Sequence, residues 1–333
     1  MGNSQKPKPP ALGIASKILR ALLVIAPIAW IYSRADASAV ASILASVSVP
    51  LIAVAAFLTV GNMVLQGIKW WALIRRFVSG LRLRTAVSVH LESVFYAIAL
   101  PSTIAQDVVK SVMLSKSHDP AVVWAASWLG RLIGLFSLLL YSAAGALCLK
   151  SDAFNADFRV PFITAAAAIV LLCALSFSKR VTRPLGAVAA KIVPAKGWAA
   201  AKKLRDGIYA FRRERAALAL AFLISAVVQL LAILCVSLTV YAVSGKFYFA
   251  ECLVFVPLAE IMAVSLPLTP GSIGIRETLL ALLFMRLGFS EGQVASYVTI
   301  SLMLSMTRVV GGAPAAWRMI RRKKADGERR GAI

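Results

Sequence analysis

The sequence predicts an all-α polytopic membrane protein, with about eight membrane-embedded helical segments and one re-entrant hairpin. Of the 333 residues, 60% are hydrophobic, whereas a globular protein in water is typically about 45–50% apolar. The mean hydropathy of the chain is +0.81. The apolar residues occur in long runs separated by basic loops, as expected when each segment in lipid must satisfy its own backbone hydrogen bonds. We expect residues 1–333 to form a single transmembrane domain.

Eight apolar segments are close to the roughly 20 residues that a helix needs to cross a bilayer. They are 12–33, 40–68, 121–149, 160–178, 216–244, 248–267, 272–288 and 293–317. The first contains Lys17 and Arg20 near its start and precedes Ala37-Ser38-Ala39, so a cleaved signal peptide is the alternative to a first spanning helix. We favour the spanning helix, because long basic side chains can reach back to the membrane surface.

Basic residues concentrate in alternate loops. The stretch 69–84 holds five lysine and arginine residues, the stretch 179–215 holds eleven, and the tail 318–333 holds seven. The loops predicted on the opposite side hold only four in all. The positive-inside rule therefore predicts a multi-pass protein of the plasma (inner) membrane, with a basic cytoplasmic loop at 179–215, a basic cytoplasmic tail at 318–333, and both termini in the cytoplasm.

The net charge of +23 does not indicate a nucleic-acid partner. The basic residues gather on one predicted side of the membrane, where anionic lipid headgroups are the nearest acidic surface. The four cysteines form no CxxC or Cys/His cluster, and the chain has no phosphate-binding loop and no nucleophile elbow. His90 and His118 are isolated and are interpreted as loop or interfacial residues. We expect no enzymatic activity, no metal and no cofactor.

One apolar segment, 86–106, breaks the alternation of the loops. Basic residues flank both of its ends, so a single crossing would put one set on the wrong side of the membrane. A hairpin that enters and leaves by the same face avoids this conflict. Pro101 would end its first half-helix, and Thr103 with Gln106 resembles a capping box for the second. An ordinary proline-kinked helix is the alternative.

The central basic loop contains an amphipathic stripe. Its apolar members are Trp198, Leu204, Ile208 and Phe211, with lysines and arginines around them. This pattern is typical of a helix that lies on an anionic membrane surface. A cytosolic continuation of the next spanning helix is the alternative.

A second proline-rich break, at residues 266–277, resembles the first. Each break is preceded by an acidic residue and followed by another, and the next helix in each half carries an arginine in an Arg-x-x-Gly step. The matching residues are Glu92 and Glu260, Asp107 and Glu277, and Arg131 and Arg308. They support the hypothesis of an inverted-topology repeat. Flanking charge leaves open whether 248–288 is a second re-entrant hairpin or two full crossings.

Charged residues inside a membrane are costly, so each is a candidate functional residue. The alternative for each is a buried ion pair that holds two helices together. The candidates are Glu92, Asp107, Arg131, Glu260, Arg276, Glu277 and Arg308. Half-helix N-termini, capped by Thr103 in the first break and begun by Pro270 in the second, would add free N–H groups that suit phosphate or carboxylate. Arginines can grip phosphate bidentately, so these features predict an anion-binding pocket near the midplane.

The run from Pro267 to Glu277, which contains Pro270 and Gly271, is the most specific motif in the chain. With the turn from Leu100 to Asp107 and the helix that carries Arg131, it resembles the flippase-like family named for the transmembrane domain of lysylphosphatidylglycerol synthases. The sequence departs from the family pattern at Ser272, where glycine is frequent, and at Gln106, where a small residue is commoner.

The resemblance extends over about residues 15–318 and implies a helical bundle that moves lipids, or lipid-linked sugars, between leaflets. No soluble aminoacyltransferase sequence follows the last apolar segment, so lysyl transfer is not implied. We expect Pro101, Thr103, Pro270 and Gly271 to join the charged candidates in binding an anionic phospholipid or a polyprenyl-phosphate-type lipid. The alternative is an accessory membrane subunit that binds a lipid intermediate for a lipid- or glycan-modifying enzyme. A membrane-embedded transferase is a third hypothesis.

Overall fold

The computed structural model describes residues 25–100, 104–148, 195–265 and 274–317, together with single positions at 164, 167 and 171. Every regular element in these ranges is a helix. Several predictions from the sequence fall on other residues and lie outside the described part. These are most of the segment 160–178, the first half of the segment 12–33, the turn at 101–103, most of the second break and the basic tail 318–333.

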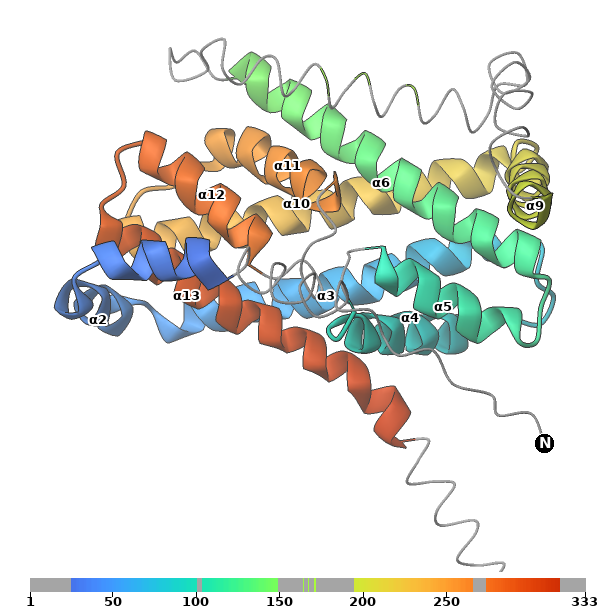
Figure 1. The fold of residues 1–333 in the computed structure, drawn as a ribbon, viewed down its shortest axis with the longest axis horizontal. Coiled ribbons are helices and arrows are strands. Elements are labelled where there is room, and N and C mark those ends of the chain that lie inside the picture. The colour runs from blue at the N-terminus through green and yellow to red at the C-terminus, as the bar shows by residue number, and fades with distance from the viewer. Residues whose placement is uncertain are drawn as a thin grey trace, which may run out of the picture.

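Four long helices run along the long axis of the molecule (Figure 1). They are α3 (Val49–Ile74), α6 (Pro120–Cys148), α10 (Arg215–Ser244) and α13 (Glu291–Ser305), which continues through a 3-10 segment, η1 (Met306–Gly312), to Trp317. Each is long and apolar enough to cross a membrane. The described part of the chain is therefore a polytopic helical membrane protein, as predicted.

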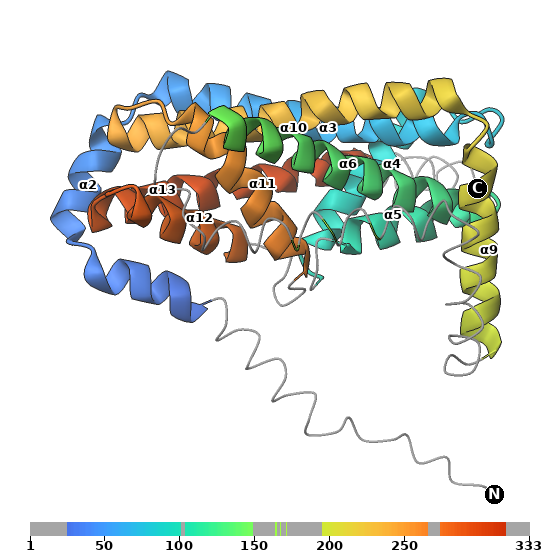
Figure 2. The same ribbon diagram turned by 90° about the horizontal axis from the view of Figure 1, so that it is seen from above.

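Four shorter helices form two pairs at opposite ends of the bundle. They are α4 (Leu83–Ala97), α5 (Ala105–Ser115), α11 (Phe249–Ser265) and α12 (Ile275–Arg286). The α4–α5 pair lies at the end that holds α9 (Ala195–Phe211), and the α11–α12 pair lies at the end that holds α2 (Ala37–Ser46) (Figures 1 and 2). The longest of the four has 17 residues, fewer than the roughly 20 that cross a bilayer.

The helix α9 lies across one end of the bundle rather than along it (Figure 2). Two members of the predicted membrane-facing stripe, Ile208 and Phe211, are only 3% and 0% exposed. Phe211 packs against the ring of Phe77, with the ring centroids 4.3 Å apart. Gly207 allows α9 to lie close to α6, because a Cβ there would be only 2.7 Å from the carbonyl oxygen of Ala121 in α6. The predicted membrane contact is therefore wrong for Ile208 and Phe211, which pack on protein instead.

Two predicted boundaries also differ from the structure. The segment 40–68 is two helices, because Ser48 takes an extended backbone conformation and a new helix, with a proline in its first turn, begins after it and continues to Ile74. The half-helix after the second break begins at Ile275 rather than at Pro270. Gly274 precedes it at a φ of +93°, a backbone conformation that favours glycine and does not continue a helix.

Two apolar cores fill the two ends of the bundle. One contains residues of α10, α11, α12 and α13, with Phe255, Phe284 and Tyr297 among its large side chains. The other joins α3, α4, α6 and α9 around Trp70 and Phe211. The polar residues that the sequence singled out lie mainly around the middle of the bundle, where the helix pairs meet the long helices.

Candidate functional site

A cavity of about 290 Å³ lies inside the bundle, lined by residues of both helix pairs. The middles of α3 and α10 and part of α6 form its walls. The second halves of α4, α11 and α13, the first residues of α5 and α12, and η1 complete the lining. Five basic and two acidic side chains of the described residues reach this cavity, which gives it an excess of positive charge within an apolar bundle. They are Lys69, Lys110, Arg131, Arg276 and Arg308, with Asp107 and Glu260.

Asp107 holds two of the basic side chains in the first half of the cavity. It lies in the first turn of α5, where the partial positive charge of the helix N-terminus stabilises a carboxylate. Its Oδ1 is 2.6 Å from Nζ of Lys110, and its Oδ2 accepts a hydrogen bond of 2.6 Å from Nε of Arg131 in α6. This shared acid fixes α5 against α6 and orients both cations along the cavity wall.

Lys69 is a third cation beside this network. Its side chain is buried in α3, with 8% of the residue exposed, and lines the cavity. Its charge interacts with those of Lys110, Asp107 and Arg131, yet no hydrogen-bond or ion-pair partner is found for it among the described residues. A Cβ at Gly134 would lie 3.7 Å from its Nζ, so the missing side chain at 134 leaves room beside the ammonium group. The prediction that Lys69 begins a cytoplasmic loop is wrong.

His90 is a second polar group without a protein partner at this end of the cavity. It is 1% exposed in α4, and neither ring nitrogen has a hydrogen-bond partner in the described part of the chain. It lines the cavity. The interpretation of His90 as a loop or interfacial residue is therefore wrong, whereas His118 lies in the turn between α5 and α6, hydrogen-bonded to Ser117.

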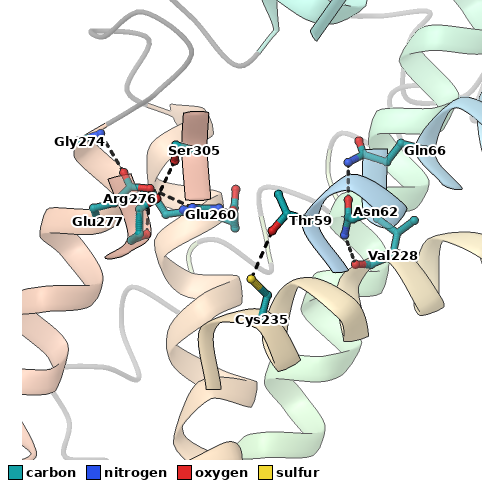
Figure 3. A network of polar contacts seen from close by, with 11 residues as sticks. Thr59, Asn62, Gln66, Val228, Cys235, Glu260, Gly274, Arg276, Glu277 and Ser305 are labelled. Carbon is teal, nitrogen blue, oxygen red and sulfur yellow. Dashed lines mark hydrogen bonds and ion pairs between the residues drawn. The ribbon is translucent and has the colours of Figure 1, made fainter. Parts of the chain in front are cut away.

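Arg276 organises the second half of the cavity (Figure 3). It donates to Oε1 of Glu260 on α11 over 3.0 Å and to Oε1 of Glu277 over 2.9 Å. Glu277 is only 1% exposed, and its Oε2 accepts a hydrogen bond of 2.8 Å from the backbone N–H of Gly274. Glu277 therefore fixes the start of α12 and does not itself line the cavity, whereas Glu260 and Arg276 do.

Arg308 reaches the same half of the cavity from η1. Its charge interacts with those of Arg276, Glu277 and Glu260. The tight 3-10 segment packs closely on α4 at Gly311, where a Cβ would overlap the carbonyl oxygen of Leu91. This contact positions Arg308 and ties the second half of the chain to the first. A 3-10 stretch within a long helix often marks a hinge.

Uncharged polar side chains join the two halves along α3 and α10 (Figure 3). Asn62 donates a 2.6 Å hydrogen bond to the carbonyl oxygen of Val228 and accepts one of 2.7 Å from Gln66. One turn away, Thr59 lies 3.4 Å from the thiol of Cys235. These contacts hold α3 against α10 and place uncharged polar groups in the cavity wall between its two charged clusters.

The structure brings five of the predicted site residues into one cavity, drawn from positions up to 201 residues apart in sequence. They are Asp107, Arg131, Glu260, Arg276 and Arg308. Two others do not line it, since Glu277 lies behind Arg276 and Glu92 is fully buried in α4. Pro101, Thr103, Pro270 and Gly271 lie outside the described residues.

Sequence reasoning missed Lys69, His90 and Lys110. The two lysines were assigned to the flanking charge that sets topology, and His90 was read as isolated. One signal was available for Lys110, because it follows Asp107 by three residues on an apolar half-helix, the spacing of a helical ion pair. For Lys69 the signal was weaker: the apolar run continues past it through Trp70 and Leu73.

The match to a known family covers nearly the whole described bundle. A sequence model of the lysylphosphatidylglycerol synthase TM region matches residues 17–310. No curated protein and no solved structure matches the chain. The matched range includes every residue that lines the cavity, and it agrees with the resemblance predicted from the two proline-rich breaks. A family match of this extent, on a bundle of apolar helices, indicates a membrane protein with a lipid-related role. The chain belongs to the lysylphosphatidylglycerol synthase transmembrane family.

Proposed function

We propose that this protein translocates an anionic lipid, or a lipid-linked intermediate, between leaflets by passing its headgroup through the central cavity. The observation that carries this proposal is the excess of basic over acidic side chains in a cavity lined by helices that are long and apolar enough to span a membrane. An uncompensated charge in a low-dielectric interior is costly, so the basic excess is best explained by an anion that enters the cavity. The acyl or prenyl chains would stay in the bilayer.

The arrangement of the short helices supports a passage with two faces. We propose that α4–α5 and α11–α12 are both re-entrant hairpins that enter from opposite sides, as in transporters built from inverted repeats. Irregular backbone at membrane depth is tolerated where it lines a cavity, and the cavity lies between these pairs. We propose further that the α9 end faces the cytoplasm of the plasma membrane, because it carries the largest cluster of basic residues.

Leaflet exchange in proteoliposomes tests this function. Purified protein would be reconstituted with a fluorescent phosphatidylglycerol analogue or a fluorescent phosphatidylcholine analogue, and the outer-leaflet label would be quenched by dithionite. The proposal predicts a faster loss of protected fluorescence for the anionic lipid than for the zwitterionic one. Equal rates for both lipids, at the rate of protein-free vesicles, would contradict it.

The alternative, an accessory subunit that presents a lipid intermediate to a lipid- or glycan-modifying enzyme, rests on the same cavity. It predicts binding of the anionic lipid to the purified protein without leaflet exchange. A membrane-embedded transferase would instead convert the lipid to a new product, which thin-layer chromatography of the recovered lipids would detect. We favour translocation without chemistry, because the cavity is lined from both ends of the bundle.

A further inference from the structure

The positive charge of the cavity is distributed unevenly between its two halves. In the second half, Arg276 is bonded to two carboxylates, those of Glu260 and Glu277, and Arg308 interacts with the charges of both acids. Two arginines thus face two carboxylates, so this half is close to neutral among the described residues.

The first half lacks this balance. Lys110 and Arg131 share the single carboxylate of Asp107, and Lys69 adds a third positive charge without a partner of its own in the described part of the chain. Among the described residues that line this half, three cations therefore face one acid, which leaves an excess of two positive charges. Trp70 closes one side of this cluster, with Nζ of Lys110 5.4 Å from its ring centroid.

Donors without a protein acceptor converge on the same place. Lys69 is more than nine-tenths buried and lines the cavity, and His90 is 1% exposed with both ring nitrogens unpartnered. Buried polar groups normally find hydrogen-bond partners, so these two side chains need an acceptor from outside the described chain. The space beside Gly134 and Lys69 gives that acceptor access to the ammonium group.

We propose that the Lys69–Lys110–Arg131 cluster, with His90, is a subsite for a phosphomonoester dianion. This inference rests on the proposed function and narrows its substrate to lipids that end in a phosphate. A phosphomonoester carries a charge of about −1.5 to −2 at pH 7 and three strong acceptor oxygens, which match two excess positive charges and several free donors. A phosphodiester headgroup carries a single negative charge and has two free oxygens, so it leaves part of the cluster uncompensated.

The chemistry of the subsite fits both a phosphate-terminated lipid and a free phosphate compound. Ligand binding to the full chain in detergent, measured by thermal unfolding, distinguishes these two sources of the phosphate. The probes are dioctanoyl phosphatidic acid, dioctanoyl phosphatidylglycerol, glycerol 3-phosphate and inorganic phosphate, each titrated at pH 8. A ligand that binds the folded state raises the midpoint with its concentration, which yields an apparent Kd. If phosphatidic acid binds at least ten-fold more tightly than glycerol 3-phosphate and inorganic phosphate, the source is a lipid; similar affinities assign the subsite to free phosphate.

We expect wild-type protein to bind phosphatidic acid at least ten-fold more tightly than phosphatidylglycerol. Lys69→Gln removes a charge without stranding an acid, so its midpoint without ligand should equal or exceed that of wild type. This variant should bind phosphatidic acid about ten- to hundred-fold more weakly than wild type, because it loses one charge-assisted hydrogen bond. It should therefore lose most of the preference for phosphatidic acid over phosphatidylglycerol. Lys203→Gln, at an exposed position on α9, is the matched control and should keep it.

Equal affinity of wild type for the monoester and the diester would overturn the inference, whatever the variants do. If Lys69→Gln kept the full preference for phosphatidic acid over phosphatidylglycerol, the inference would be overturned as well. Lys69 would then be a hydrated lysine in the cavity wall. These outcomes are distinct from a failure of the proposed function. Leaflet exchange of phosphatidylglycerol without monoester preference leaves translocation intact, whereas Lys69-dependent binding of phosphatidic acid without any exchange supports the subsite and contradicts translocation.

Discussion

At the scale of single residues, the cavity depends on carboxylates that each bind more than one donor group. Asp107 holds Lys110 and Arg131, and Glu277 holds both Arg276 and the backbone N–H of Gly274, the residue that precedes α12. Removing a shared acid strands the cations around it in a region of low dielectric, whereas removing an unpaired cation strands nothing. Stability and ligand binding should therefore respond in opposite ways to the two kinds of substitution.

Asp107→Asn should destabilise the protein by on the order of 3–5 kcal/mol, the usual cost of stranding a buried charge. Thermal unfolding in detergent measures this loss. The matched control is Glu291→Gln, which removes the acid of an ion pair with Arg34 whose side chains are 51% and 39% exposed. Exposed pairs contribute at most about 1 kcal/mol, so the control should melt close to wild type. Similar midpoints for both variants would show that Asp107 does not hold the cluster together.

The residues of the cavity could be predicted from the sequence only in part. Arg131, Arg276 and Arg308 stood out because each is a charged residue inside a predicted apolar span. Lys69 and Lys110 did not, because a lysine near a predicted membrane boundary looks the same whether it marks the surface or turns inward. The distinction depends on where the helix ends, and α3 continues to Ile74, five residues beyond Lys69.

At the scale of elements, close backbone contacts at glycines hold the short helices against the long ones. Gly207 brings α9 onto α6, and Gly311 brings η1 onto α4. These contacts explain why two apolar positions of α9 are buried in protein rather than in lipid. A hydrophobic stripe on a short helix predicts burial, and the sequence alone does not tell whether lipid or a neighbouring helix provides it.

Gly311→Ala should destabilise the contact between η1 and α4. A Cβ there would overlap the carbonyl oxygen of Leu91, so the helices must separate, and overpacking of this kind costs about 1–3 kcal/mol. Gly61→Ala is the control, because nothing lies within 4 Å of its Cβ position in α3 and alanine favours a helix by about 1 kcal/mol. Thermal midpoints that fall for Gly311→Ala and hold or rise for Gly61→Ala are expected; the reverse order would refute the close contact.

Phe211→Ala should lower stability by about 3–5 kcal/mol, as expected for a large aromatic side chain removed from a core. This result would follow from burial against Phe77 and α6. Protease accessibility of α9, followed together with the thermal midpoint, is the measurement. If Phe211 contacted lipid instead, the variant would lose membrane affinity of the 179–215 loop while the bundle melted at an unchanged temperature.

The long helices were predicted more accurately than the short ones. The predicted segments 121–149 and 216–244 match α6 and α10 to within one residue at each end, because hydropathy alone defines a spanning helix. The segment 40–68 merged two helices, since a serine and a proline at 48–50 left the apolar run unbroken. The half-helices depend on caps and glycine conformations, which average hydropathy does not record.

At the scale of the whole molecule, the two helix pairs occupy opposite ends of the bundle and the cavity lies between them. The proposed topology places 79 and 117 on the cytoplasmic face and 246 on the outer face. In a variant without Cys148, Cys173, Cys235 and Cys252, single cysteines at Ser79 and Ser117 should react with a membrane-impermeant maleimide only from the cytoplasm. A cysteine at Lys246 should react only from outside. Labelling of Ser117 from outside would mean that the chain crosses the membrane between α4 and α5, and the first hairpin would not be re-entrant.

The central claim is that the basic side chains of the cavity conduct an anionic headgroup rather than hold the helices together. The most direct test is the leaflet-exchange rate of a labelled anionic lipid, normalised to folded protein, for wild type and for Lys69→Gln, which removes a cation without stranding an acid. Our account predicts that exchange falls to the rate of protein-free vesicles while most of the protein remains folded. If exchange falls only in proportion to the loss of folded protein, these side chains are scaffold and the assignment of the cavity as a headgroup passage is wrong.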